Sequence, residues 1–282
     1  MATESTVVYL GEHTETLPPR KLQRPSLGTF ALVAVTLFTF AFLYVPIVVL
    51  IFFSFNSARS GAVWEQFSLR WYERVLSNPR IMEAAMNSLI VALLATLGSV
   101  VIGTLMALAM ERYRFRSQPL WDGLLYLPVI VPEIVMGISL LLFFAAVRLE
   151  RGIVTLVISH IAFCMPFVYL TMRARLADFD RSLEEAAQDL GANEWVTFRR
   201  ITLPLLMPGI ISSALLAFTL SLDDFVISFF VTGVGSQTLP VYIWGQIRRG
   251  VTPEVNAIST LMLALSIILV LISQLLQRRQ RV

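Results

Sequence analysis

The chain has 282 residues, of which 56% are hydrophobic and only 15% are charged. Its mean hydropathy of +0.74 excludes an ordinary water-soluble domain and indicates a protein that lies in a membrane. The net charge of +3 and the pI near 9.3 come from arginines between the apolar stretches, so they do not indicate nucleic-acid binding.

Six apolar stretches are long enough to cross the roughly 30 Å hydrocarbon core of a bilayer. Backbone polar groups in lipid must be satisfied within their own segment, so each stretch is predicted to be a helix. The predicted fold class is an all-α polytopic membrane protein with six transmembrane helices. These helices cover approximately residues 29–54, 84–110, 123–147, 152–172, 205–231 and 255–277.

Residues 1–24 are predicted to form a polar tail ahead of a membrane domain over 25–282. The first apolar run is too long for the core of a cleavable signal peptide, so we interpret it as a retained span. Of the 22 Lys and Arg residues, fourteen lie in the termini and in alternate connections, including segment 173–204. Because positive residues favour the inside, both termini and segment 173–204 are predicted to be cytoplasmic.

Two kinds of chemistry are excluded by what the sequence lacks. Cys164 is the only cysteine, and His13 and His160 are the only histidines, so a disulfide or a multi-histidine metal site within one chain is impossible. No phosphate loop of the type G-x-x-x-x-G-K-[ST] occurs, and no connection is long enough for a catalytic domain. We therefore predict no cofactor and no enzymatic activity, and we expect His160 to bond between helices and Cys164 to pack.

Two external connections contain short predicted elements. In the first, Ser68 can cap a helix that continues to Leu76 and lies at the membrane interface. The last connection, residues 232–254, contains the apolar run Leu239–Trp244, which is too short to span and predicts a re-entrant or interfacial segment. Within that run, Tyr242 and Trp244 are candidates to line a passage for cations with their aromatic faces.

Glu133 is the first of three carboxylates predicted to lie at bilayer depth, where insertion scales give a cost of about 2.5–3.5 kcal/mol. It lies about ten residues into the third span, and Pro128 and Pro132 precede it. Pro132 lacks the amide that would bond to the Pro128 carbonyl, so a kink with free carbonyls beside an acid is predicted. This spot suits a cation on a substrate path, although an acid that only stabilises the kink fits the same pattern.

Asp223 and Asp224 are predicted to lie in the outer half of the fifth span. Adjacent carboxylates repel each other unless a cation, a guanidinium or water compensates them, and a linear polyamine supplies ammonium groups at both ends. Neighbouring helix positions diverge by about 100°, so one acid can face a pore while the other caps or pairs. A pair that simply ends the apolar span is the alternative.

Segment 173–204 is a charged connection between two apolar stretches. Ser182 and Glu185 have the spacing of a capping box, which predicts that a helix begins at Leu183. Leu183, Ala186, Ala187 and Leu190 form an apolar stripe.

Beyond that helix, Gly191 suits a left-handed C-terminal cap. Asn193 can cap a second short helix that ends at Arg199 and Arg200, before Pro204 opens the next span. We call residues 182–204 the elbow. Its stripe either contacts another protein or packs on its own bundle.

The elbow resembles the "EAA" loop of membrane permeases in ATP-binding-cassette importers. The resemblance is carried at matching spacing by Glu185, Ala186, Ala187, Gly191, Ile201, Leu203 and Pro204. It extends over most of the chain beyond the first 24 residues and is strongest with the inner-membrane permeases of spermidine/putrescine importers. The further stretches that carry it are residues 55–57, 71–72, 112–116, 132–141, 159–164, 218–224 and 253–257.

The resemblance implies a type I importer permease in a bacterial inner membrane. It further implies that the elbow docks on an ATP-binding cassette ATPase dimer, that a second permease completes the path, and that a periplasmic polyamine-binding protein delivers the solute. Two alternatives stay open. One is a related permease for another amine, such as an opine, and the other is a cation channel or carrier that works without a motor.

Overall fold

The computed structural model describes residues 27–58, 63–177, 179–250 and 252–278, which are helical apart from short connections and one isolated bridge between Asn56 and Phe67. The chain divides into two units, residues 1–48 and 49–282, and all helices after α1 belong to the second. The helices are α1 (Leu27–Ser54), α2 (Arg70–Ser77), α3 (Pro79–Arg112), α4 (Gln118–Ile130), α5 (Glu133–Ala146), α6 (Ile153–Ala177), α7 (Ser182–Asp189), α8 (Glu194–Thr197), the π-helical η1 (Phe198–Thr202), α9 (Leu203–Asp223), α10 (Val226–Val231), α11 (Leu239–Ile247) and α12 (Pro253–Arg278).

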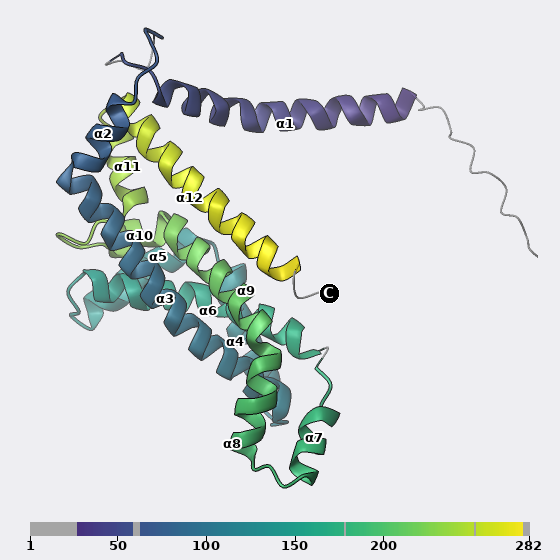
Figure 1. Ribbon diagram of the computed structural model, residues 1–282. Helices are drawn as coiled ribbons and strands as arrows, with labels where there is room; N and C mark the ends of the chain where they lie inside the picture. The colour runs from purple at the N-terminus through teal and green to yellow at the C-terminus, as the bar shows by residue number, and fades with distance from the viewer. Residues whose placement is uncertain (1–26, 59–62, 178, 251, 279–282) are drawn as a thin grey trace, which may run out of the picture. The chain divides into compact units, whose positions relative to one another are not determined.

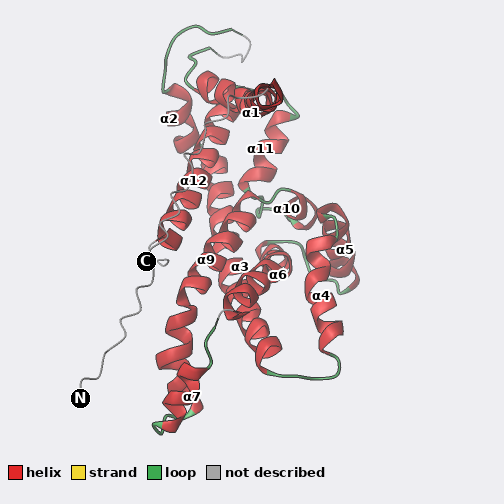
Figure 2. Ribbon diagram, turned by 90° about the vertical axis from the view of Figure 1, so that its right-hand side faces the viewer, coloured by secondary structure: helices red, strands yellow, loops and turns green. Residues whose placement is uncertain are grey.

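Helices α3, α6 and α9 pack along one another and form the core of the second unit (Figure 1). Ala92, Ala95 and Ala107 of α3 are fully buried. Lipid tails are as apolar as leucine, so helices in a membrane associate through close packing, and small side chains allow that approach. Helices α7 and α8 lie at one end of these three helices, and α2 and α11 lie at the other (Figures 1 and 2).

The number of predicted spans agrees with the structure. Among the described residues, five helices are long and apolar enough to cross a membrane, and the pair α4–α5 makes a sixth if it is counted as one broken span. That pair is bent by 108°, so the predicted kink is in fact a complete break. Val131 is extended and Pro132 follows it, because a residue before proline avoids the helical region and proline donates no hydrogen bond.

The predicted bounds of the fifth span were wrong at both ends. The helix begins at Glu194, because α8, η1 and α9 form one continuous rod of 30 residues. Pro204 therefore does not open a separate helix. One π-helical turn, in which the Leu203 amide bonds to the Phe198 carbonyl, bridges the place where a break was expected. At the other end α9 stops at Asp223, and the expected continuation to Val231 is the separate helix α10.

The two short elements predicted in the connections before residue 79 and after residue 231 are present. The helix predicted from Ser68 begins instead at Arg70, and Ser68 is not its N-cap residue. Trp71 of α2 and Tyr242 of α11 are both buried in one apolar cluster with Ile258 of α12. The run predicted to be re-entrant or interfacial is thus α11, packed against α3 and α12.

Among the described glycines, Gly233 leaves the least room for a side chain. A Cβ atom there would lie 1.9 Å from the Arg151 carbonyl oxygen, and backbone cannot yield as a flexible side chain does. We expect Gly233→Ala to lower the melting temperature in detergent by more than about 5 °C. Gly245→Ala in α11, where the added carbon meets nothing within 4 Å, is the control and should leave the melting temperature equal or higher. Equal melting temperatures for both variants would contradict the placement of this loop.

Candidate functional site

The turn of the elbow follows the predicted glycine geometry. Gly191 has φ +88°, in the left-handed region that favours glycine. Its amide donates to the Gln188 carbonyl at 2.9 Å, and the Ala192 amide donates to the Ala187 carbonyl at 3.0 Å. These two bonds form a Schellman motif, which satisfies carbonyls at the end of α7. The predicted C-terminal cap is confirmed.

The predicted capping box was wrong. Helix α7 begins at Ser182 rather than Leu183, and its N-cap residue, Arg181, makes no side-chain cap. The Ser182 amide donates to the Asp180 carboxylate at 2.9 Å, so the acid two residues earlier makes the turn that the serine was expected to make. Hydrogen bonding from Ser182 lowers the pKa of the Asp180 carboxyl. The Glu185 side chain is exposed instead of returning to the backbone.

The start of the second elbow helix agrees with its prediction. The Asn193 side chain accepts a hydrogen bond from the Val196 amide at 2.9 Å and caps α8. Trp195 stacks on Phe198 with ring centroids 6.0 Å apart, and it still exposes 67% of its surface.

Glu184 ties the elbow to the bundle, a role that its position on the polar side of α7 did not reveal. Its carboxylate pairs with Arg112 at the end of α3 and accepts a hydrogen bond from the Thr202 hydroxyl in η1. Next to it, Arg181 donates to the Glu111 backbone carbonyl at 2.9 Å. The start of α7 is therefore fixed both to α3 and to the rod that contains α9.

The apolar stripe of α7 is not packed on its own bundle. Leu183 exposes 46% of its surface and Leu190 exposes 90%. Ala186 and Glu185 are also exposed, whereas Ala187 is half-buried. In the rod that follows, Ile201 and Leu203 are half-buried and Pro204 is exposed. Over the described residues, the outer face of the elbow is an open apolar surface beside exposed carboxylates.

The three predicted acids lie together. Glu133, Asp223 and Asp224 line one cavity of about 340 Å³. Glu133 is the first residue of α5, and the aspartates lie where α9 ends, so two helix ends meet there. The other lining residues are Phe163, Thr219, Leu220, Phe225 and Val226.

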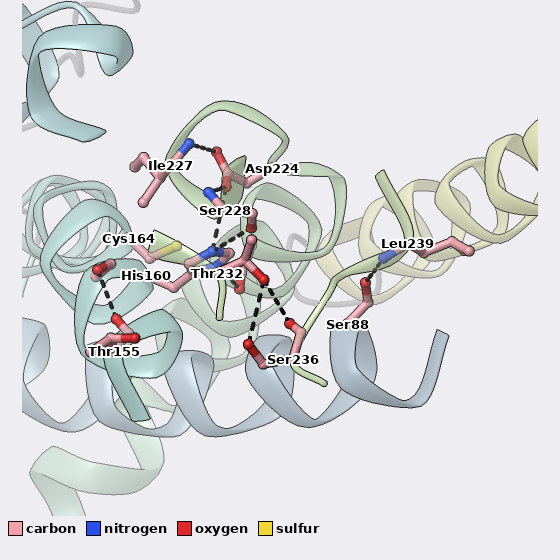
Figure 3. A network of polar contacts seen from close by, with 12 residues as sticks. Ser88, Thr155, His160, Cys164, Asp224, Ile227, Ser228, Thr232, Ser236 and Leu239 are labelled. Carbon is pink, nitrogen blue, oxygen red and sulfur yellow. Dashed lines mark hydrogen bonds and ion pairs between the residues drawn. The ribbon is translucent and has the colours of Figure 1, made fainter. Parts of the chain in front are cut away.

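The two aspartates are in different surroundings. Asp223 is exposed and accepts hydrogen bonds from the Ser266 hydroxyl of α12 at 3.0 and 3.1 Å. Asp224 is 7% exposed, and its carboxylate accepts the amides of Ile227 at 3.2 Å and Ser228 at 2.8 Å, which satisfies two donors in the first turn of α10 (Figure 3).

His160 lies fully buried beside Asp224. Its Nδ1 is 2.7 Å from the Ser221 hydroxyl, and its Nε2 is 3.0 Å from the Ser228 hydroxyl and 3.4 Å from the Asp224 carboxylate (Figure 3). The predicted bonding between helices is confirmed, but the contact with Asp224 was missed because 64 residues separate the two in sequence. Cys164, one turn further along α6, is buried and packs as predicted.

Trp244 and Tyr242 lie in different places. Trp244 contacts Phe225 of the acidic cavity, with ring centroids 5.2 Å apart. Tyr242 instead lines a separate cavity of about 240 Å³ with Arg80 and Glu83. Trp244 therefore packs on a lining residue of the acidic cavity without lining it, and Tyr242 lies at a different cavity.

Three comparisons place these features among known proteins. Residues 99–282 match the family described as "Binding-protein-dependent transport system inner membrane component". The spermidine/putrescine transport system permease protein PotC of Escherichia coli is 45% identical over 85% of this chain and 90% of its own length. The putrescine transport system permease protein PotI of Escherichia coli is 42% identical over 82% of this chain and 85% of its own length.

Solved structures share the fold. A chain of a bacterial ABC transporter that imports the acidic polysaccharide alginate has a TM-score of 0.70 at 18% identity, over 89% of this chain and 94% of that one. A chain of the MetNI methionine ABC transporter has a TM-score of 0.55 at 16% identity, over 72% of this chain and 98% of that one. The predicted architecture, that of a type I importer permease, is confirmed.

The anchoring role of Glu184 can be tested by hydrogen exchange of the α7 amides. Glu184→Ala removes the contacts with both Arg112 and Thr202, so we expect these amides to exchange about tenfold faster, which corresponds to roughly 1.4 kcal/mol. The control is Glu185→Ala, which removes an exposed carboxylate from the same helix and should leave exchange unchanged. Equal exchange rates in both variants would show that α7 is held by other contacts.

Proposed function

Because the chain belongs to the family of binding-protein-dependent transport system inner membrane components, we propose that it forms the path for polyamines in an ATP-driven importer. The single observation that carries the substrate class is the acidic cavity. Three carboxylates from two distant parts of the sequence line it, and no Lys or Arg is among its described lining residues. Relatives named for spermidine and putrescine support the same substrate class.

A polyamine fits this cavity chemically. Uncompensated carboxylates inside a membrane protein are costly, and ammonium groups of a substrate reduce that cost while they pass. Phe163 and Phe225 supply apolar walls for the methylene segments between the ammonium groups, and their ring faces attract cations.

Energy for transport enters through the elbow. We infer that the open surface of Leu183, Leu190 and Trp195 docks in a groove of an ATPase subunit. Closure of the ATPases then moves α7, and the Glu184 contacts carry this motion to α3 and to the rod. The rod of 30 residues is about 45 Å long and ends at Asp223 in the acidic cavity, so it links the two sites mechanically.

Membership of this family supports the remaining partners that we propose. A second permease subunit closes the path on the side that this chain leaves open, and a periplasmic binding protein delivers the polyamine. The chain spans the inner membrane several times, with both termini and the elbow on the cytoplasmic side, where the ATPases lie.

Uptake by the complete importer in vesicles tests the substrate site. Glu133→Gln and Asp223→Asn each remove one charge from the cavity, so we expect the apparent KM for spermidine to rise by about tenfold or more with assembly unchanged. Glu150→Gln, which changes an exposed acid outside the cavity, serves as the control and should take up spermidine normally. Unchanged uptake in both cavity variants would remove these acids from the path.

The same vesicles distinguish an importer from a self-contained channel or carrier. Uptake of spermidine should require ATP and the ATPase subunits. If this chain alone carried spermidine across the vesicle membrane, the motor-coupled function would be wrong.

The coupling role of the elbow can be tested at Gly191. Leucine strains the left-handed backbone at φ +88° although no atoms crowd the site, so Gly191→Leu should lower the ratio of spermidine imported to ATP hydrolysed by about fivefold or more. Asparagine tolerates this conformation, so Gly191→Asn is the matched control and should stay coupled. A fully coupled leucine variant would show that the shape of this turn does not matter.

A further inference from the structure

The acidic cavity contains three carboxylates, and the contacts of each differ enough to assign different tasks. We propose that His160 is a positioning residue of the transport path. Through Asp224 it holds the break between α9 and α10 in place, and it leaves Glu133 and Asp223 as the two carboxylates that bind ammonium groups. This inference rests on the proposed function and specifies how its site works.

The Asp224 carboxylate is already occupied by protein donors. One oxygen accepts the Ile227 amide, and the other accepts the Ser228 amide at 2.8 Å and faces His160 Nε2 at 3.4 Å. The residue is only 7% exposed, although it reaches the cavity wall. An ammonium group could bind Asp224 only by displacing donors that also hold the start of α10.

The Asp224 carboxylate decides the role of one ring nitrogen of His160. A carboxylate can only accept, so Nε2 carries the proton that points toward Asp224 and Ser228. Nδ1 and the Ser221 hydroxyl are 2.7 Å apart, and the hydroxyl can be either the donor or the acceptor of this hydrogen bond. Both ring nitrogens are therefore engaged by protein groups.

The same ring contacts side chains of two other helices. His160 belongs to α6, Ser221 to the last turn of α9, and Ser228 to α10. The contacts thus lie on both sides of the α9–α10 break, with Asp224 between them. A side chain in this position fixes the direction in which α9 ends, and with it the position of Asp223.

Glu133 and Asp223 remain available for a substrate. Both residues are exposed, and the described polar contact of the Asp223 carboxylate is a hydroxyl, that of Ser266. A hydroxyl carries no charge and can turn away when an ammonium group arrives. The two acids come from α5 and α9 and face one cavity, so the arrangement favours a linear di- or polyamine over a monoamine.

A double-mutant cycle in vesicles with the complete importer tests this division of tasks. His160→Leu and Asp224→Asn should each raise the apparent KM for spermidine by about tenfold, with Vmax per assembled complex changed less than about threefold. If His160 acts through Asp224, the double variant should be no worse than the worse single variant. By contrast, the effects of His160→Leu and Asp223→Asn should multiply.

Two conservative variants keep the test decisive if the leucine variant does not assemble. The amide of His160→Gln reaches the position of Nε2 and should restore KM to within about threefold of the wild type, whereas His160→Asn reaches only the position of Nδ1 and should not. Cys164→Ser changes the next turn of α6 and should behave like the wild type. The wild type should also prefer spermidine to a monoamine such as butylamine.

The outcomes separate the two levels of the proposal. A wild-type importer that does not take up spermidine would overturn the proposed function and this inference with it. If the wild type takes up spermidine but the His160 and Asp224 effects multiply, or if His160 variants lower Vmax without changing KM, only the positioning role is wrong. Equal KM values for the Gln and Asn variants would also overturn it.

Discussion

A helix that ends inside a membrane bundle leaves backbone groups that water cannot reach, and they need partners within the protein. This constraint governs the place where α9 ends. The Asp224 carboxylate accepts amides at the start of α10, while His160 contacts that carboxylate and hydroxyls on both sides of the break. These contacts hold the first turn of α10 beside the end of α9, where Asp223 presents an exposed carboxylate to the cavity.

The acidic cavity and the elbow are separated along the molecule, but one element reaches both. The rod from Glu194 to Asp223 starts at the capped turn of the elbow and ends at the cavity. Near the elbow end of the rod, Thr202 donates a hydrogen bond to Glu184, which also pairs with Arg112 of α3. A motion that a partner imposes on α7 therefore has a stiff route through the protein, as the coupling in the proposed function requires.

The sequence predicted those features that short-range chemistry decides. Hydropathy located the spans, the left-handed turn required Gly191, and Asn193 capped α8 as its side chain allows. Errors arose where a distant or competing group decided the outcome. Asp180 replaced Ser182 at the start of α7, and the partners of Glu184 and His160 come from other helices, so no local pattern could show them. Grouping of the three acids into one cavity likewise needed the tertiary structure.

The wide turn of η1 has a consequence for the geometry of the elbow. A π-helical turn holds one residue more than an α-helical turn, and one residue corresponds to about 100° of rotation about the helix axis. Pro204, which has no amide hydrogen, lies just beyond this turn. The π-helical turn therefore sets the angular position of Trp195 around the axis of α9. In a regular α-helix of the same length, the indole of Trp195 would point in another direction.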